Sequence, residues 1–122
     1  MKEEKITLCF NRARLNELSK IEQELIEKAT FAFSTAYAPY SGFLVGASVL
    51  LENEKIISGN NQENVAYPSG LCAERVALFY AGAKYPRIGI RTIAISAKSK
   101  TFEITTCFSA RSPSRSQVAT GL

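Results

Sequence analysis

The spacing of apolar side chains in the first half of the chain predicts one helix followed by a β-hairpin. In residues 19–37, apolar positions recur at steps of three and four, and most of the acidic residues fall between them. This periodicity is typical of an amphipathic helix, and Pro39 ends it. Residues 44–51 and 56–59 are rich in Val, Leu and Ile and are separated by four polar residues, so they predict two paired strands.

The second half of the chain predicts a further helix and a third strand. Pro68 and Gly70 favour a turn, after which good helix formers run from Cys72 to about Lys84. Residues 92–97 then form an apolar run of strand length. Strand, hairpin, helix and strand in this order predict an α/β domain in which helices pack on a sheet.

The two ends of the chain depart from this pattern. Residues 6–10 form a short apolar run that predicts either an edge strand or an extended arm. Residues 107–122 are polar, basic and rich in serine, so we expect a divergent, disordered tail after a domain that spans residues 1–106. The last predicted strand would then have an unpaired edge.

Composition and charge narrow the class of protein. A chain of 122 residues with 46% hydrophobic residues suits one domain with a modest core, and a net charge of +4 does not demand an anionic partner. No run approaches a membrane span and the first five residues are mostly charged, so we expect neither a membrane segment nor a signal peptide, and a cytoplasmic location. The three widely spaced cysteines make a disulfide framework an unfavoured interpretation. Histidine is absent, so a metal site here would need thiolates, carboxylates or water.

The first candidate catalytic residues lie at the start of the second predicted helix. Cys72 lies at or near the helix N-terminus, where the dipole and the free N–H groups favour a thiolate. Glu74 falls in the first turn, where a carboxylate is also favoured. A thiolate and a carboxylate in one helical turn could bind a metal-activated water and move its protons. The same two residues could also be structural, with the cysteine buried in the core and the carboxylate stabilising the helix N-terminus.

Three sequence motifs, found in a fixed order along the chain, favour the catalytic interpretation. They are residues 38–47 (APYSGFLVGA), 59–67 (GNNQENVAY) and 67–75 (YPSGLCAER). Together they resemble the small homotetrameric cytidine deaminases, and the resemblance runs from about Ile21 to Thr106. It implies a three-layer α/β/α fold with a mixed sheet, and zinc-dependent hydrolysis of cytidine or deoxycytidine to the uridine form in pyrimidine salvage.

The resemblance also implies roles for individual residues. Cys72 would be a zinc ligand, Glu74 would move protons at the pyrimidine ring, and Ala73 would contact substrate. Arg75 would hydrogen-bond the ligand thiolates, although a solvated helix charge is the alternative interpretation.

The substrate itself is assigned to residues of the two upstream blocks. The resemblance implies that Asn61 and Glu63 hold the ribose, and residues two apart on an extended segment point the same way, so both can reach sugar hydroxyls. Phe43 would pack on the pyrimidine. A polar loop and a core aromatic are the structural alternatives for these positions.

The chain departs from the family pattern near its end. The family takes two further zinc ligands from a Pro-Cys-x-x-Cys block, which is absent, and the family's final helix and strands are absent as well. Cys107 stands nearest to the expected block. A catalytically inactive, deaminase-like nucleoside-binding protein with an incomplete zinc site is therefore the second hypothesis. A third, in which the serine- and arginine-containing tail binds nucleic acid, is disfavoured because two arginines give a weak electrostatic footprint.

Overall fold

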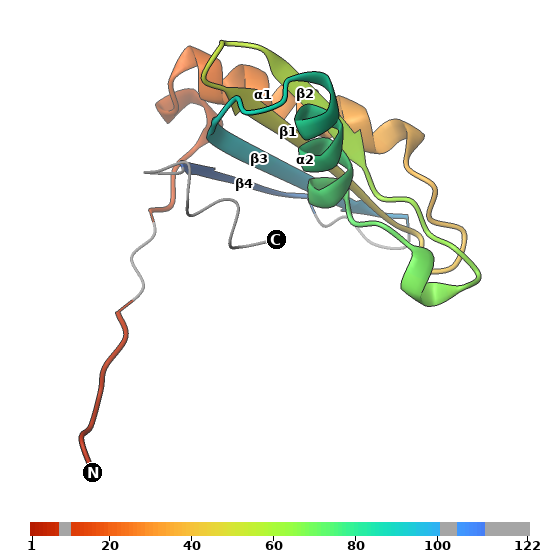
Figure 1. Ribbon diagram of the computed structural model, residues 1–122, viewed down its shortest axis with the longest axis horizontal. Helices are drawn as coiled ribbons and strands as arrows, with labels where there is room; N and C mark the ends of the chain where they lie inside the picture. Colours follow the sequence, from red (N-terminus) through yellow and green to blue (C-terminus); the bar gives the residue numbers. More distant parts are fainter. Residues whose placement is uncertain (8–10, 101–104, 112–122) are drawn as a thin grey trace.

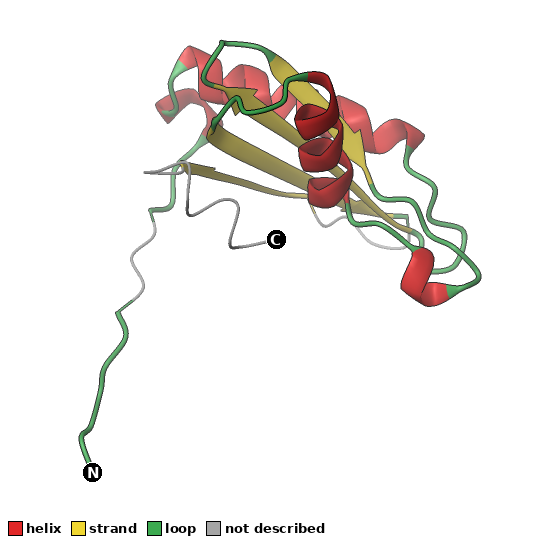
Figure 2. Ribbon diagram, in the orientation of Figure 1, coloured by secondary structure: helices red, strands yellow, loops and turns green. Residues whose placement is uncertain are grey.

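A computed structural model describes residues 1–7, 11–100 and 105–111, and within them one four-stranded sheet is covered by a helix on each face (Figures 1 and 2). The helices are α1 (Lys20–Ala32) and α2 (Ala73–Lys84). The strands are β1 (Phe43–Leu51), β2 (Ile56–Asn60), β3 (Ile90–Ser99) and β4 (Thr105–Arg111), in the spatial order β2-β1-β3-β4. The expected three-layer α/β/α arrangement is confirmed.

The expectation of a mixed sheet is wrong for the strands that the structure describes. Every adjacent pair, β1–β2, β1–β3 and β3–β4, is antiparallel. The reason is the position of β1: it lies between β2 and β3, so the two strands joined by the α2 crossover run in the same direction without being neighbours. Among residues 1–7, 11–100 and 105–111, an isolated bridge between Tyr37 and Gln62 is parallel.

Strand β4 was not expected from the sequence. It covers the edge of β3 from Lys98, opposite Thr105, to Thr92, opposite Arg111. The boundary expected at residue 106 therefore falls inside a paired strand, and the edge of β3 is not left open. The rest of the expected tail, residues 112–122, lies outside the described residues, as do residues 8–10 of the N-terminal apolar run.

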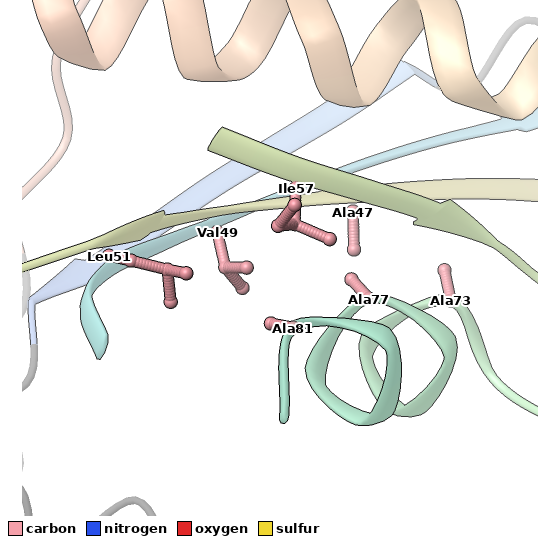
Figure 3. Close-up of a cluster of buried hydrophobic side chains, with 7 residues drawn as sticks. All are labelled: Ala47, Val49, Leu51, Ile57, Ala73, Ala77 and Ala81. Atoms are coloured by element: carbon pink, nitrogen blue, oxygen red, sulfur yellow. The ribbon is translucent and has the colours of Figure 1, made fainter. Parts of the chain in front are cut away.

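The two faces of β1 separate the core into two clusters. Ala47, Val49 and Leu51 face α2 and pack with its buried alanines (Figure 3). Leu50, one position out of step with them, packs with residues of α1 on the opposite face. This alternation of side chains along a strand is what buries both faces of the sheet.

Helix α1 begins and ends at identifiable signals. The hydroxyl of Ser19 accepts a hydrogen bond from the backbone N–H of Glu22, which is an N-cap contact, and donates to the carboxylate of Glu22. The helix ends at Ala32 and continues as a 3-10 turn over Phe33–Thr35, so it is shorter than the range predicted from periodicity.

Small residues allow both helices to lie close to the sheet. A Cβ atom added at Gly46 of β1 would come 1.8 Å from the carbonyl oxygen of Ala29 in α1, and one at Gly59 of β2 would come 2.6 Å from the backbone nitrogen of Ala77 in α2.

Neither helix of the described residues combines the length and apolar character that crossing a membrane requires.

Candidate active site

The N-terminus of α2 presents four consecutive residues of the proposed catalytic block. A 3-10 turn at Tyr67–Ser69 precedes it, and Cys72 is the N-cap residue, so the predicted placement of this cysteine at a helix start is confirmed. The thiol of Cys72 is exposed and makes no capping hydrogen bond. Ala73 is fully buried in the cluster against β1, which fixes the orientation of this first turn. Glu74 is half-buried.

This helix start opens onto a cleft of about 1030 Å³. Three stretches of chain line the cleft: Tyr40, Ser41 and Val45 beside the start of β1, residues 61–65 after β2, and most of residues 67–75. Cys72, Ala73, Glu74 and Arg75 are thus brought to the same cavity as Asn61 and Glu63, although the two groups come from different blocks of the sequence.

Glu63 holds one wall of the cleft through a single carboxylate oxygen. Its Oε1 accepts hydrogen bonds from the backbone N–H of Tyr40, at 3.0 Å, and from that of Ser41, at 3.1 Å. The N–H of Ser41 contributes most to lowering the pKa of Glu63 below its ordinary value, since these bonds favour the charged form; desolvation acts in the opposite direction, and the N–H of Tyr40 adds to the lowering. The carboxylate is therefore ionised and anchored at neutral pH.

Asn61 is likewise tied to the backbone of β1. Its Oδ1 accepts from the N–H of Val45 and its Nδ2 donates to the carbonyl of Phe43, both at 2.9 Å. Both ends of the carboxamide are therefore engaged with the protein itself.

Of the seven sequence-predicted residues, six line the cleft and Phe43 does not. Phe43 is 40% exposed at the first position of β1 and is not among the residues that line the cleft. Arg75 lines the cleft, and its guanidinium lies over the ring of Phe79 at 5.5 Å from the centroid, a cation–π contact along one face of α2. The structure thus gives Arg75 an aromatic partner that the sequence prediction did not include.

The donor set does not fit a three-ligand zinc site within the part of the chain that the structure describes. A catalytic zinc takes three protein ligands and leaves one position open. No group of three Cys, Asp or Glu side chains gathers among residues 1–7, 11–100 and 105–111 where side chains are described. Cys72 is the one thiol placed at the cleft; Cys9 lies outside the described residues, and Cys107 belongs to β4.

Tyr40, Ser41 and Gln62 line the cleft but had no predicted role. Gln62 pairs through its backbone with both Tyr37 and Leu71, which draws the three walls together. Local periodicity carried no signal for these residues, because their place depends on contacts between segments far apart in sequence. The available signal was their membership of the blocks 38–47 and 59–67, which carry the family resemblance.

Comparison with known families and proteins gives one consistent result. Residues 19–109 match the family model of the cytidine and deoxycytidylate deaminase zinc-binding region. Cytidine deaminase from Halalkalibacterium halodurans is 44% identical over 78 residues, which cover 64% of this chain and 58% of the relative. Cytidine deaminase from Sporosarcina psychrophila is 48% identical over 59 residues, covering 48% of this chain and 43% of the relative.

Solved structures agree with these relatives. Cytidine deaminase from Burkholderia pseudomallei superimposes with a TM-score of 0.60 at 40% identity, covering 68% of this chain and 65% of that one. Cytidine deaminase from Mycobacterium tuberculosis gives 0.58 at 34% identity, covering 61% and 59%. The matched part of the chain thus spans about half the length of the curated relatives.

Proposed function

Because the chain belongs to the cytidine and deoxycytidylate deaminase family, we propose that its cleft binds a pyrimidine nucleoside and deaminates cytidine or deoxycytidine by hydrolysis. The observation that carries this proposal is the convergence of Cys72–Arg75 and Asn61–Glu63 on one cleft. The relatives named cytidine deaminase support the choice of substrate class.

Glu74 is proposed to move the protons of the reaction. Water adds to C4 of the cytosine ring, and Glu74 delivers a proton to N3. A second proton passes to the amino group, the C4–N4 bond breaks, and ammonia leaves the uridine product. A half-buried carboxylate at a helix N-terminus that also lines the cleft suits this task.

The remaining site residues divide between the base and the sugar. Ala73 is proposed to contact the pyrimidine from the lining of the cleft, and the Asn61–Glu63 segment to meet the ribose. Phe43, at the first position of β1 and outside the lining, is proposed to pack on the pyrimidine on the strength of the family resemblance alone. Glu63 brings a carboxylate that is ionised at neutral pH, which is a strong acceptor for sugar hydroxyls.

Zinc and assembly are proposals at the level of the family. The matched family region is described as zinc-binding, whereas the described donor set supplies Cys72 without two further ligands. We therefore infer that the 122-residue chain holds zinc weakly, and no step above depends on the metal. The family resemblance carries four further expectations. They are a contact of Arg75 with the thiolate of Cys72, assembly into a homotetramer, a role in pyrimidine salvage and a cytoplasmic location.

The incomplete donor set favours one second candidate, a nucleoside-binding protein that does not turn cytidine over. Incubation with cytidine and deoxycytidine, followed by chromatography for the uridine forms and an assay for ammonia, separates the two. The variant Glu74→Gln should lose turnover and keep binding. The matched control Glu27→Gln changes an exposed carboxylate of α1 on the opposite face of the sheet and should keep both.

Each outcome decides between the candidates. Turnover that depends on Glu74 supports the deaminase. Binding of cytidine without turnover supports the second candidate, and absence of both overturns the proposed function.

A further inference from the structure

Asn60, the last residue of β2, joins the end of α1 to the segment that leads into the cleft. It lies opposite Gly46 in the β1–β2 pair, and residues opposite each other share one face of the sheet. That face is the one covered by α1, because a Cβ atom at Gly46 would meet the carbonyl oxygen of Ala29. The side chain of Asn60 therefore reaches α1, where its Nδ2 donates to the carbonyl of Ala32, the last residue of the helix, at 2.9 Å.

The carboxamide of Asn60 binds two segments that are far apart in the sequence. Nδ2 also donates to the hydroxyl of Thr35, at 2.8 Å, in the 3-10 turn that follows α1. Since a carbonyl oxygen only accepts, the contact with Ala32 fixes which end of the carboxamide is the donor. Oδ1 then faces the other segment and accepts from Nε2 of Gln62 at 2.6 Å. One side chain thus holds the end of α1 on one side and the residues after β2 on the other.

The two segments held in this way meet again at Glu63. They are first joined at Tyr37, whose N–H donates to the carbonyl of Asn61 at 3.0 Å and whose carbonyl accepts from the N–H of Glu63 at 2.8 Å. At the cleft, Oε1 of Glu63 accepts from the N–H groups of Tyr40 and Ser41. A shift between the two segments would therefore reach the carboxylate of Glu63.

We propose that Asn60 is a positioning residue: it sets the spacing between the end of α1 and residues 61–63, and so places the carboxylate of Glu63 for the sugar of a bound nucleoside. This inference rests on the proposed function, in which the Asn61–Glu63 segment meets the ribose. Asn60 is not among the residues that line the cleft, so it acts on a ligand through its neighbours. The competing explanation is a purely structural role, in which the carboxamide supplies a donor to the end of α1 and nothing more.

Four variants separate these two roles. Asn60→Ala removes the three hydrogen bonds of the carboxamide. Thr35→Val keeps the shape of the side chain and removes one acceptor, so it is the milder change. Glu63→Ala removes the group that Asn60 is proposed to position. Asn53→Ala is the matched control, because Oδ1 of Asn53 also accepts a hydrogen bond, from the N–H of Lys55, in the hairpin turn and outside the cleft.

Calorimetric titration with cytidine and with free cytosine tests the effect on a ligand. Asn60→Ala should weaken cytidine roughly two- to tenfold, the factor that one misplaced hydrogen bond is worth, and cytosine by less than about twofold. In the Glu63→Ala background the same change should weaken cytidine by less than about twofold, because no carboxylate is left to position. Unchanged binding of cytidine, equal weakening of both compounds, or the full loss in the Glu63→Ala background overturns the proposal.

The backbone amide shift of Ser41 tests the placement of Glu63 without a ligand. The N–H of Ser41 contributes most to holding the pKa of Glu63 below its ordinary value, so this shift should follow the titration of the carboxyl group. Asn60→Ala should loosen the bond and move the midpoint upward, toward 4.5, whereas Asn53→Ala should leave it in place. An unchanged midpoint in Asn60→Ala overturns the proposal.

Two further outcomes are also decisive. If Asn60→Ala does not fold, Thr35→Val carries both comparisons, with a smaller loss expected in the same direction. Wild-type protein that binds neither cytidine nor cytosine overturns the proposed function, and the titration of Glu63 then decides whether Asn60 places this carboxylate.

Discussion

Replacing Gly59 by alanine should push α2 away from the sheet. A Cβ atom at this position would lie 2.6 Å from the backbone nitrogen of Ala77, 2.9 Å from a methyl carbon of Val76 and 3.0 Å from the Cα of Ala77. Ordinary contact begins at 3.4 Å, so the helix must retreat by about 0.8 Å to relieve the closest approach. Two of the three atoms are backbone, which cannot rotate out of the way as a side chain does.

The expected loss is about 1–3 kcal/mol in the free energy of unfolding, the usual cost of overpacking a close-packed core. This is a large part of the roughly 5–15 kcal/mol that holds a domain folded. Since α2 carries Cys72 and Glu74 at its N-terminus, the same displacement should also weaken cytidine binding.

Gly82→Ala provides the matched control. Gly82 lies in the same helix, is exposed, and has no atom within 4 Å of the position that a Cβ would take. Alanine is preferred to glycine inside helices, so this variant should gain up to about 1 kcal/mol. Urea unfolding followed by circular dichroism measures both changes from the shift in midpoint at constant slope. A Gly59→Ala protein as stable as Gly82→Ala would refute the close packing of α2 on β2.

Four further predictions concern the charge of Glu63, its titration, the zinc content and a buried hydroxyl. Glu63→Gln should weaken cytidine by about 1.5–3 kcal/mol and leave free cytosine unchanged, because a charge-assisted bond to the sugar is lost; equal losses in calorimetry would count against it. Since the pKa of Glu63 is lowered in the folded protein, its anchoring of the loop is complete above the ordinary value of 4.5 and is lost as the pH falls through the lowered pKa, which amide shifts of the loop should follow. Elemental analysis of the unmodified chain should find less than one zinc ion per chain. A tail that carries Pro-Cys-Gly-x-Cys-Arg-Gln-Val after Arg111 should raise the content to one zinc ion per chain. One zinc ion per chain in the unmodified protein would contradict this prediction. Ser48→Ala should lower the free energy of unfolding by about 1 kcal/mol in urea titration, because the buried hydroxyl donates to the carbonyl of Leu25 at 2.6 Å; no change would show that this bond contributes nothing net.

Local patterns were sufficient for most of the elements but not for the sheet as a whole. The apolar runs placed β1 and β2 within one residue of their observed ends, since both strands are held by a short polar turn. The range of β4 shows no regular alternation of apolar and polar residues, and it forms a strand by pairing with the edge of β3. That pairing, like the antiparallel order of the sheet, depends on contacts across the fold, which periodicity does not encode.

The sequence indicated which residues form the candidate site, but it did not indicate most of the contacts that these residues make. Pro68 and Gly70 indicated the turn that puts Cys72 at a helix start, and the structure has it as the N-cap. The engagement of Asn61 with β1 was not predictable, because it depends on how residues 16 and 18 positions away align beside it. The cation–π contact of Arg75 with Phe79 follows helical spacing and could have been read from the sequence.

A titration of the isotope-labelled 122-residue protein with cytidine, followed by backbone amide shifts, tests most directly the proposal that the cleft binds a nucleoside. We expect saturable shifts that cluster at residues 61–63 and 72–75, the two groups that the fold brings to one cavity. Glu27 on the exposed face of α1 should not respond. Shifts confined to surfaces outside the cleft, or no saturable shift, would show that cytidine does not bind in this cleft.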